Sequence, residues 1–273
     1  MSYGKGISYM NKQKPNIVLF DMDGTLTEAR RPIGMPMIKV LRELISQNER
    51  AHIGVVTGSD LDYVKQQMKP LFEKDYDLAR QIHWMPCNGT KRYKFNGSDW
   101  EVLHSVDMRT HLGEQQFINL MQKLSEQQHH IAALRIPLTG HFVNYRGSMI
   151  NWCPIGRNAN HKDREEFMKL DKSYGRHSLR EEYLIRLQLK TSMNPVVCKL
   201  GGDTSFDIYP KGWDKTYCLK YFEGYNIYFI GDRCHQDGND FEIFKKLQPH
   251  SWSTNSPTNT IRIINEQILH LIS

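Results

Sequence analysis

Two acidic residues one position apart are the most chemically suggestive feature of the sequence. Asp21 and Asp23 directly follow an apolar run at 17–20 and are followed by a Gly24-Thr25 turn. Such a run predicts a strand buried on both faces of a parallel sheet, and open α/β sheets bind ligands at the carboxyl ends of their strands. We therefore expect both carboxylates to lie at a ligand site.

Neighbouring carboxylates repel each other unless a cation or a shared proton relieves them. Oxygen ligands beside a phosphate suit Mg²⁺, which takes one or two carboxylates and keeps several waters. At such a site Asp21 could attack phosphorus and form an aspartyl-phosphate. Asp23 could protonate the leaving oxygen and later deprotonate the incoming one. The alternative is that both acids belong to a turn and cap a helix.

A second acidic site follows a second apolar run. Asp232 ends the run at 226–231, and Asp240 follows eight positions later in Gly-Asn-Asp. Two parallel strands that end in acids could bring Asp21, the main-chain carbonyl of Asp23 and Asp232 around one Mg²⁺. Asp240 would be a further ligand or would orient the ligands. Turn and cap roles are the alternatives for both Asp232 and Asp240.

Three further side chains could bind a transferred phosphoryl group. Thr57 and Ser59 lie where a predicted strand at 52–57 gives way to a helix, and a hydroxyl beside helix N-terminal amides suits a phosphate. Both remain candidates. Lys215 opens a predicted helix, where a cation opposes the helix dipole and needs an anion nearby. The aspartates or a phosphate would supply that anion; the alternative is an exposed lysine.

The composition is that of an ordinary globular protein of one large or two modest domains, with 273 residues, 39% hydrophobic and 24% charged. The net charge of +6 comes from scattered basic residues, so we expect an anionic small substrate and no nucleic-acid partner. Five cysteines without a C-x-x-C pair indicate reduced thiols in the cytoplasm. No apolar run reaches membrane-spanning length, so we expect no membrane partner. Residues 1–14 are expected to form a loose extension.

The hydrophobic pattern predicts an α/β protein with an inserted segment. We expect a parallel-sheet core from 1–104 and 211–273, and an α+β cap domain with an antiparallel sheet and helices from 105–210. A sheet with helices on one face would form a lid. The core pattern predicts helices at 37–45 and 61–72 and a hairpin at 93–103. For the insert, it predicts a helix around 117–124, strands at 131–138, 142–146, 149–153, 196–200 and 204–209, and helices at 161–171 and 179–190.

The Asp-x-Asp-Gly-Thr-Leu-Thr string from Asp21 to Thr27 closely resembles the nucleophile motif of the haloacid dehalogenase (HAD) superfamily of phosphotransferases. The Gly-Asp and Asn-Asp pairs that contain Asp232 and Asp240 are similar to the metal motif of the same superfamily. This resemblance implies a HAD-like Rossmannoid core, with Asp21 as nucleophile, Asp23 as acid and base, and a Ser or Thr and a Lys that bind the phosphoryl group.

The insert carries a more specific resemblance. Pro-Ile-Gly-Arg at 154–157, Ser-Phe-Asp-Ile-Tyr-Pro at 205–210 and Gly-Trp-Asp-Lys at 212–215 closely resemble eukaryotic-type phosphomannomutases, from about residue 16 onward. That family interconverts mannose 6-phosphate and mannose 1-phosphate through a hexose 1,6-bisphosphate, towards GDP-mannose synthesis. Residues 145–149 read Tyr-Arg-Gly-Ser-Met where the family usually has Phe-Arg-Asn-Gly-Met.

The resemblance implies further site residues and partners. Arginines would hold the phosphate that is not reacting, because Arg stays charged and binds phosphate through paired donors. Ser205 and Asp207 would hold the sugar. The resemblance also implies Mg²⁺, a hexose 1,6-bisphosphate activator and a possible homodimer formed through the cap. The implied phosphate-binding arginines are Arg30, Arg146, Arg157 and Arg164.

Two other functions remain open. A capped sugar-phosphate phosphatase would share every core residue and would differ in whether water reaches the phospho-aspartate. A non-catalytic regulator could bind a sugar phosphate with the same lid. The intact set of Asp21, Asp23, Lys215 and Asp232 argues against the regulator.

Overall fold

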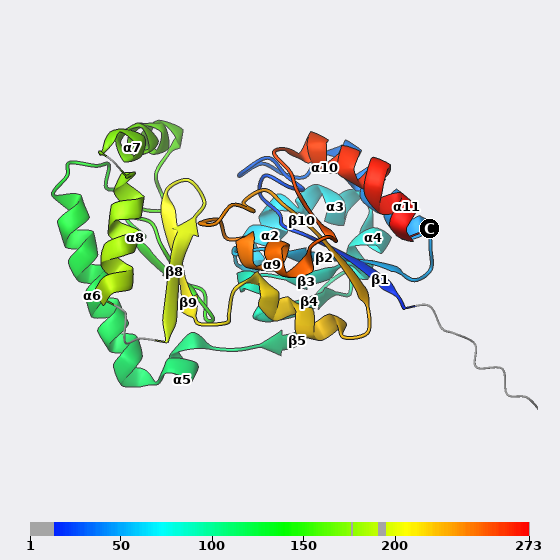
Figure 1. The fold of residues 1–273 in the computed structure, drawn as a ribbon, viewed down its shortest axis with the longest axis horizontal. Helices are drawn as coiled ribbons and strands as arrows, with labels where there is room; N and C mark the ends of the chain where they lie inside the picture. Colours follow the sequence, from blue (N-terminus) through cyan, green and yellow to red (C-terminus); the bar gives the residue numbers. More distant parts are fainter. Residues whose placement is uncertain (1–13, 176, 191–194, 273) are drawn as a thin grey trace, which may run out of the picture.

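The computed structural model describes residues 14–175, 177–190 and 195–272 (Figure 1). The extension expected at 1–14 lies outside the described residues except for Lys14. Two sheets organise the chain, one of seven strands and one of four. The seven-stranded sheet has the order β11-β10-β1-β2-β3-β4-β5, in which the first five strands run parallel and β4 and β5 run antiparallel. Its strands are β1 (Asn16–Phe20), β2 (Ala51–Val56), β3 (His83–Met85), β4 (Lys91–Phe95), β5 (Trp100–Ser105), β10 (Asn226–Gly231) and β11 (Ser251–Ser253).

The central strand β1 is buried along its whole length. It pairs in parallel with β10 on one side and with β2 on the other, so that Phe20 lies opposite both Ile230 and Val55. Because these strands end at the same edge of the sheet, Asp21 and Asp232 emerge side by side. The predicted parallel core is therefore confirmed.

Helices cover both faces of the seven-stranded sheet. On one face the apolar sides of the helices pack with Val18, Phe20 and Ile53 of the sheet. On the other face Ile17 and Leu19 pack against a shorter layer. The first layer contains α1 (Met35–Ser46), α2 (Leu61–Gln67), α3 (Lys69–Lys74), α4 (Tyr76–Gln81), α10 (Pro257–Ile263), η3 (Ile264–Ile268) and α11 (Leu269–Ile272). The second contains η2 (Lys215–Phe222) and α9 (Phe241–Leu247), and the short turn η1 (Cys87–Gly89) follows β3.

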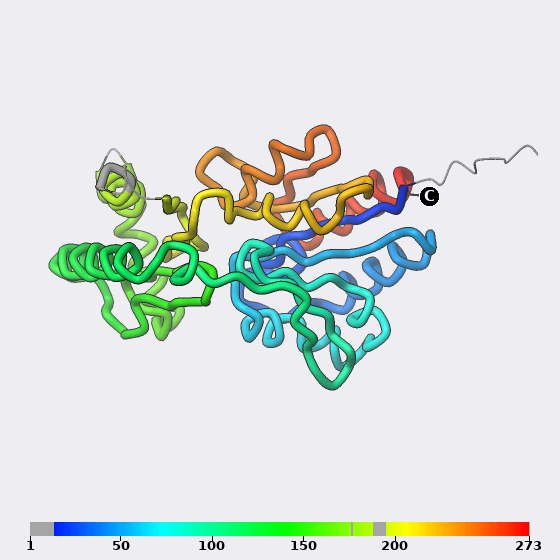
Figure 2. The backbone as a smooth tube through the Cα atoms, turned by 90° about the horizontal axis from the view of Figure 1, so that it is seen from below, coloured from blue at the N-terminus to red at the C-terminus, as the bar shows by residue number. Residues whose placement is uncertain are grey.

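The four-stranded sheet and its helices occupy one end of the molecule, joined to the rest by two stretches of chain (Figure 1 and Figure 2). It is antiparallel, in the order β6-β7-β9-β8, and carries a second hydrophobic cluster. We call this part, from Met108 to Pro210, the cap. Its elements are α5 (Met108–Leu112), α6 (Glu114–Ala132), β6 (Val143–Tyr145), β7 (Ile150–Trp152), α7 (His161–Ser173), α8 (Leu179–Lys190), β8 (Val196–Gly201) and β9 (Ser205–Pro210).

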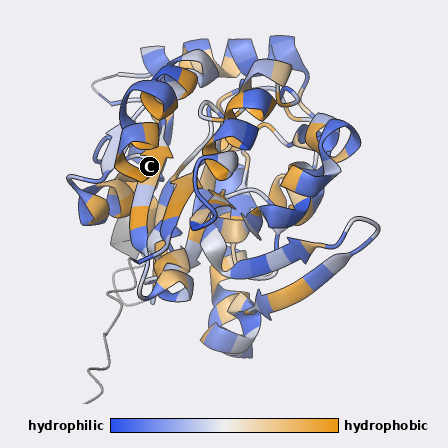
Figure 3. Cartoon of the chain, turned by 90° about the vertical axis from the view of Figure 1, so that its right-hand side faces the viewer, coloured by the Kyte–Doolittle hydropathy of each residue, from blue (hydrophilic) through white to orange (hydrophobic). Residues whose placement is uncertain are grey.

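Alternation along the cap strands gives their sheet one apolar and one polar face. Trp152 and Phe206 stack against each other and are buried beneath the helices. Asn151 precedes Trp152 and Asp207 follows Phe206, and both line a cavity on the opposite face of the sheet. Successive strand residues point to opposite faces, so a period of two produces this division. Figure 3, which faces the end of the molecule with the seven-stranded sheet, shows apolar residues concentrated on the central strands.

The strand predicted at 131–138 is wrong. Helix α6 continues to Ala132, and Ile131 lies in the same buried cluster as Leu124, seven positions earlier. Two helical turns span about seven residues, so both side chains lie on one face. The helical spacing of apolar residues therefore continues into the short apolar run that suggested a strand.

Two predicted helices differ in detail. The helix expected at 61–72 is broken at Met68, because Pro70 cannot continue a helix but is accepted in the first turn of α3. The helix expected to begin at Lys215 is a 3₁₀ helix. The remaining elements predicted for the insert occur close to their expected ranges. Among the described residues, no helix is both long and apolar enough to cross a membrane.

We expect the cap cluster to contribute stability through α6. Leu124 is completely buried, whereas Ile118 on the same helix is 39% exposed. Leu124→Ala should lower the free energy of unfolding by about 2–5 kcal/mol, because it leaves a cavity in a packed core. Ile118→Ala should change it by about 0.5 kcal/mol. Urea denaturation of both variants checks this, and equal effects would contradict the burial of Leu124.

Candidate functional site

A glycine turn allows the two acidic strand ends to meet. Gly24 has a φ of 81°, which favours glycine, and a Cβ at this position would overlap the carboxylate of Asp232. The chain after β1 therefore passes directly against the chain after β10. Asp232 forms this contact, and Asp21 lies three residues before Gly24.

Lys215 is completely buried at the centre of the site. Its Nζ forms an ion pair with Asp21 and another, of 2.5 Å, with Asp240. Burial lowers the pKa of Lys215, but the two carboxylates outweigh burial and hold that pKa above its usual value. The lysine therefore stays charged, and the alternative of an exposed side chain does not apply.

Asp21, Asp232 and Asp240 form an acidic cluster, because each offers an oxygen within 4.8 Å of the others. Burial raises the pKa of Asp21 well above its usual value. Lys215 lowers this pKa, whereas the nearby carboxylates of Asp240 and Asp232 raise it further. Burial and Asp240 raise the pKa of Asp232 to about 6. Oδ1 of Asp232 is buried and has no hydrogen-bond partner among the described residues. A hard-oxygen cluster with excess negative charge fits Mg²⁺.

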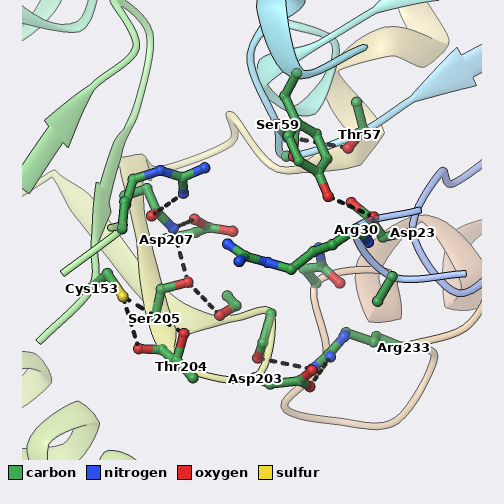
Figure 4. A pocket seen from close by; sticks show the side chains of 18 of the residues that line it. Asp23, Arg30, Thr57, Ser59, Cys153, Asp203, Thr204, Ser205, Asp207 and Arg233 are labelled. Carbon is green, nitrogen blue, oxygen red and sulfur yellow. Dashed lines mark hydrogen bonds and ion pairs between the residues drawn. The ribbon is translucent and has the colours of Figure 1, made fainter. Parts of the chain in front are cut away.

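The carboxylate of Asp23 is held outside this cluster. Its Oδ1 accepts hydrogen bonds from the Arg30 amide at 3.1 Å and from the Tyr63 hydroxyl at 2.9 Å. Burial raises the pKa of Asp23, while these two hydrogen bonds lower it. Burial also raises the pKa of Tyr63, as does Asp23, so the phenol remains protonated. Figure 4 shows Asp23 at the core side of the cavity, beside Arg30.

The two candidate phosphoryl-binding hydroxyls lie in one short loop. Oγ1 of Thr57 accepts a hydrogen bond of 3.1 Å from the Ser59 amide, and both residues line the cavity. The turn after β3 supports the loop, because the Cys87 and Asn88 amides donate to the carbonyls of Ser59 and Thr57 at 2.8 Å each. Both hydroxyls remain candidates.

These side chains meet in a cavity of about 300 Å³ between the core and the cap. Figure 4 shows Thr57 and Ser59 on the core side and Ser205 and Asp207 on the cap side. Lys215 and Asp240 are buried beneath its wall. The predicted site residues that line it are Asp21, Asp23, Arg30, Thr57, Ser59, Arg146, Arg157, Arg164, Ser205, Asp207 and Asp232.

Two cap arginines are held by neutral partners. Arg157 donates to Oδ1 of Asn151 at 2.9 Å, and Arg164 donates to Oγ1 of Thr204 at 2.7 Å. Burial lowers the pKa of both guanidinium groups, and nearby cations lower it further, Arg146 for Arg157 and Arg30 for Arg164. Among the described residues, neither forms an ion pair with a carboxylate. This concentration of positive charge fits an anion such as a phosphate.

Arg146 differs from the other cap arginines. Its side chain is 4% exposed, and it donates to the carbonyl of Gly58 in the core loop at 2.6 Å. Its Nε lies 3.7 Å from a carboxylate oxygen of Asp60. Arg146 therefore joins the cap to the loop that carries Thr57 and Ser59.

Asn151 organises the predicted sugar-binding pair. Its Nδ2 lies 3.0 Å from Oγ of Ser205 and 2.8 Å from Oδ1 of Asp207. The Ser205 hydroxyl donates to the carbonyl of Gly201 at 2.6 Å. One amide therefore orients both side chains toward the cavity.

A family model described as "Eukaryotic phosphomannomutase" matches residues 38–270. The chain belongs to the eukaryotic phosphomannomutase family. A phosphomannomutase of Nicotiana benthamiana is 35% identical over 263 residues, covering 95% of this chain and 97% of the relative. One of Arabidopsis thaliana is 35% identical over 247 residues, covering 90% and 93%. The family resemblance inferred from the sequence is confirmed.

Solved structures resemble this fold at low sequence identity. An ATP-bound IMP-nucleotidase of Plasmodium falciparum has a TM-score of 0.65 and 16% identity, over 95% of this chain and 61% of that chain. An IMP-bound, N-terminally truncated form has a TM-score of 0.63 and 13% identity, over 95% and 69%. These likenesses show that the core and cap form a known fold.

Sequence reasoning missed several residues at the site. Arg233, next to Asp232, forms an ion pair of 2.7 Å with Asp203 of the cap and so joins core and cap. Asn151 could have been found from its alternation with buried neighbours. Tyr63 had no such signal, because it meets Asp23 across forty positions of sequence.

The raised pKa of Asp232 makes a prediction for the metal-free protein. Its ionisation above about pH 6 costs folding free energy, so the stability of the metal-free protein should fall as pH rises from about 4 through 6. At pH 8 with a chelator, Asp232→Asn should therefore unfold at a higher temperature than the wild-type chain. Mg²⁺ should raise the unfolding temperature of the wild-type chain, because binding stabilises the native state, but not that of the variant.

Differential scanning fluorimetry with and without Mg²⁺ measures both effects. Asp62→Asn is the matched control, because the side chain of Asp62 is 94% exposed. This variant should change neither the unfolding temperature at pH 8 with a chelator nor its increase with Mg²⁺. If Mg²⁺ raised the unfolding temperature of Asp232→Asn as much as that of the wild-type chain, Asp232 would not be a metal ligand.

Proposed function

We propose that this chain interconverts mannose 6-phosphate and mannose 1-phosphate through an aspartyl-phosphate on Asp21 and a hexose 1,6-bisphosphate intermediate. Membership of the phosphomannomutase family supports this proposal. The observation that carries it at the site is a single cavity with Asp21 on one side and the unpaired guanidinium groups of Arg157 and Arg164 on the other. A mutase needs both sides, because it must hold one phosphate while the other reacts.

On the core side, each residue has a distinct task. Asp21 attacks phosphorus, Lys215 binds and neutralises phosphoryl oxygens, and Thr57 or Ser59 donates a hydrogen bond to them. Asp21, Asp232 and Asp240, with the main-chain carbonyl of Asp23, would hold Mg²⁺. When bound, that ion would offset the negative charge of the phosphoryl group during transfer. Positioning and charge neutralisation are the main contributions to catalysis of phosphoryl transfer.

Asp23 handles the proton. When a bisphosphate phosphorylates Asp21, the carboxyl of Asp23 gives its proton to the departing sugar oxygen. In the reverse transfer, Asp23 takes the proton of the attacking sugar hydroxyl while the bond between phosphorus and Asp21 breaks. The proton and the phosphoryl group therefore return to their starting places after one cycle.

Arg157, Arg164 and Arg146 of the cap, together with Arg30 of the core, would hold the phosphate that is not reacting. Ser205 and Asp207 of the cap would bind the sugar. The bisphosphate must then rebind in the reverse orientation, which requires a cap that accepts phosphate at either end of the hexose. We propose that residues 105–210 act as a lid on the core formed by 1–104 and 211–273. Closure would keep water from the phospho-aspartate. A homodimer through the cap and a cytoplasmic location stay predictions.

A coupled assay tests the function directly. It compares isomerisation of mannose 1-phosphate with release of inorganic phosphate, in Mg²⁺, with and without a hexose 1,6-bisphosphate. We expect isomerisation to exceed phosphate release and to increase with the bisphosphate, which maintains the phospho-enzyme. Phosphate release as the main reaction would instead establish a sugar-phosphate phosphatase. Retained phosphate binding without turnover would indicate a regulator.

Arg157→Ala should distinguish binding of the phosphate that is not reacting from phosphoryl transfer to Asp21. A charge-assisted contact is worth about 1.5–3 kcal/mol, or roughly tenfold to over a hundredfold in affinity. We expect kcat/KM for a hexose phosphate to fall by about that factor. Transfer from acetyl phosphate to Asp21 should change much less, because that donor has no distal phosphate.

Steady-state kinetics with both donors measures this difference. Arg109→Ala is the control, because Arg109 is a cap arginine that pairs with Glu114 on the surface and does not line the cavity. An equal loss with both donors would mean that Arg157 supports the fold or the core site instead.

A further inference from the structure

The acid–base carboxylate is fixed through only one of its two oxygens. Oδ1 of Asp23 accepts both hydrogen bonds that the carboxylate makes among the described residues, one from the Arg30 amide and one from the Tyr63 hydroxyl. Oδ2 has no protein partner there, and Asp23 lines the cavity. The carboxylate therefore has one oxygen for anchoring and one for exchange with a ligand.

The two donors come from different parts of the core. Arg30 lies in the loop after the nucleophile, and its φ of 63°, uncommon for a residue with a side chain, directs its amide at Asp23. Tyr63 lies in the first turn of α2, where its amide donates to Oδ1 of Asp60, the N-terminal capping residue of that helix, at 3.0 Å. A single donor would leave the carboxylate free to turn about its own bonds, whereas two donors from separate elements fix its plane.

We propose that Tyr63 is a positioning residue that holds Oδ1 of Asp23 so that Oδ2 meets the sugar hydroxyl; this inference rests on the proposed function. In this role the Tyr63 hydroxyl transfers no proton itself, because it donates to Oδ1 of Asp23. It acts through Asp23, from a helix that begins two residues after Ser59. The acid–base group and the phosphoryl-binding loop are thereby tied to one rigid element.

This placement sets which oxygen exchanges the proton. As the sugar oxygen bonds to phosphorus and the Asp21 oxygen departs with its electron pair, the hydroxyl proton moves to Oδ2 of Asp23. In the opposite direction Oδ2 returns the proton to the sugar oxygen as its bond to phosphorus breaks. A small displacement of the carboxylate would lengthen this transfer, and a misplacement of about 1 Å can cost about a hundredfold in rate.

The test is Tyr63→Phe, compared with two phosphoryl donors in the presence of Mg²⁺. A hexose oxygen is a poor leaving group that needs a proton, whereas acetate leaves acetyl phosphate without one. We expect kcat for hexose phosphate isomerisation to fall about tenfold to a hundredfold, a part of the full acid–base contribution. KM for the hexose phosphate should change by less than about threefold, because Phe keeps the ring that lines the cavity and the lost hydroxyl donates to Asp23. Phosphorylation of Asp21 by acetyl phosphate should keep its wild-type rate.

Two controls make the outcome decisive. Tyr76→Phe removes a hydroxyl that bonds the Asn96 carbonyl away from the cavity, and it should leave both reactions unchanged. In an Asp23→Asn background, Tyr63→Phe should cause no further loss of hexose transfer, because the carboxylate that it positions is already gone. An equal loss with both donors, an unchanged kcat, or a further loss in the Asp23→Asn background would overturn the proposal. A wild-type chain that releases phosphate without isomerisation would overturn the proposed function, whereas the contrast between the two leaving groups would still test Tyr63.

Discussion

The site depends on one buried ammonium group. A charge removed from water is costly unless it is paired, and Lys215 is completely buried. Asp21 and Asp240 pair with it, which ties the start of η2 to the chain segments that follow β1 and β10. One cation does not balance two carboxylates, and Asp232 adds a third within the same cluster. The excess negative charge favours a divalent cation, and the fixed carboxylate of Asp21 is thereby presented to the cavity.

The core and the cap contribute side chains of opposite charge to the site. The core gathers carboxylates beneath the cavity, whereas the cap presents Arg157 from the loop after β7 and Arg164 from α7, each hydrogen-bonded to a neutral partner. Polar contacts join these parts around the cavity, such as Arg146 with the Gly58 carbonyl and Arg233 with Asp203. Most hydrophobic packing lies within each part, although Cys87, Trp213 and Tyr217 of the core also pack with the cap cluster. The cavity between the two parts is lined mainly by polar and charged side chains.

The sequence predicted the parts of the site that follow from local pattern. Apolar runs that end in acids identified β1 and β10, and parallel pairing then placed Asp21 beside Asp232. It failed at 131–138, where a short apolar run suits either a strand or the end of a helix and only packing against the cap cluster decides. It also had no means of finding Tyr63, because that contact exists only after α2 packs beside the loop after β1. Local sequence likewise leaves Thr57 and Ser59 equivalent, and both line the cavity.

The central claim is that the phosphoryl group passes from sugar to Asp21 and back to sugar. A single-turnover chase tests it most directly. The chain is phosphorylated in Mg²⁺ with a hexose 1,6-bisphosphate that carries a radioactive label in its phosphate groups. It is then separated from free donor and mixed with mannose 6-phosphate. The account predicts that the label leaves Asp21 as hexose bisphosphate and that an Asp21→Asn chain takes up no label. Label that leaves as inorganic phosphate, or that is retained by the Asp21→Asn chain, would contradict it.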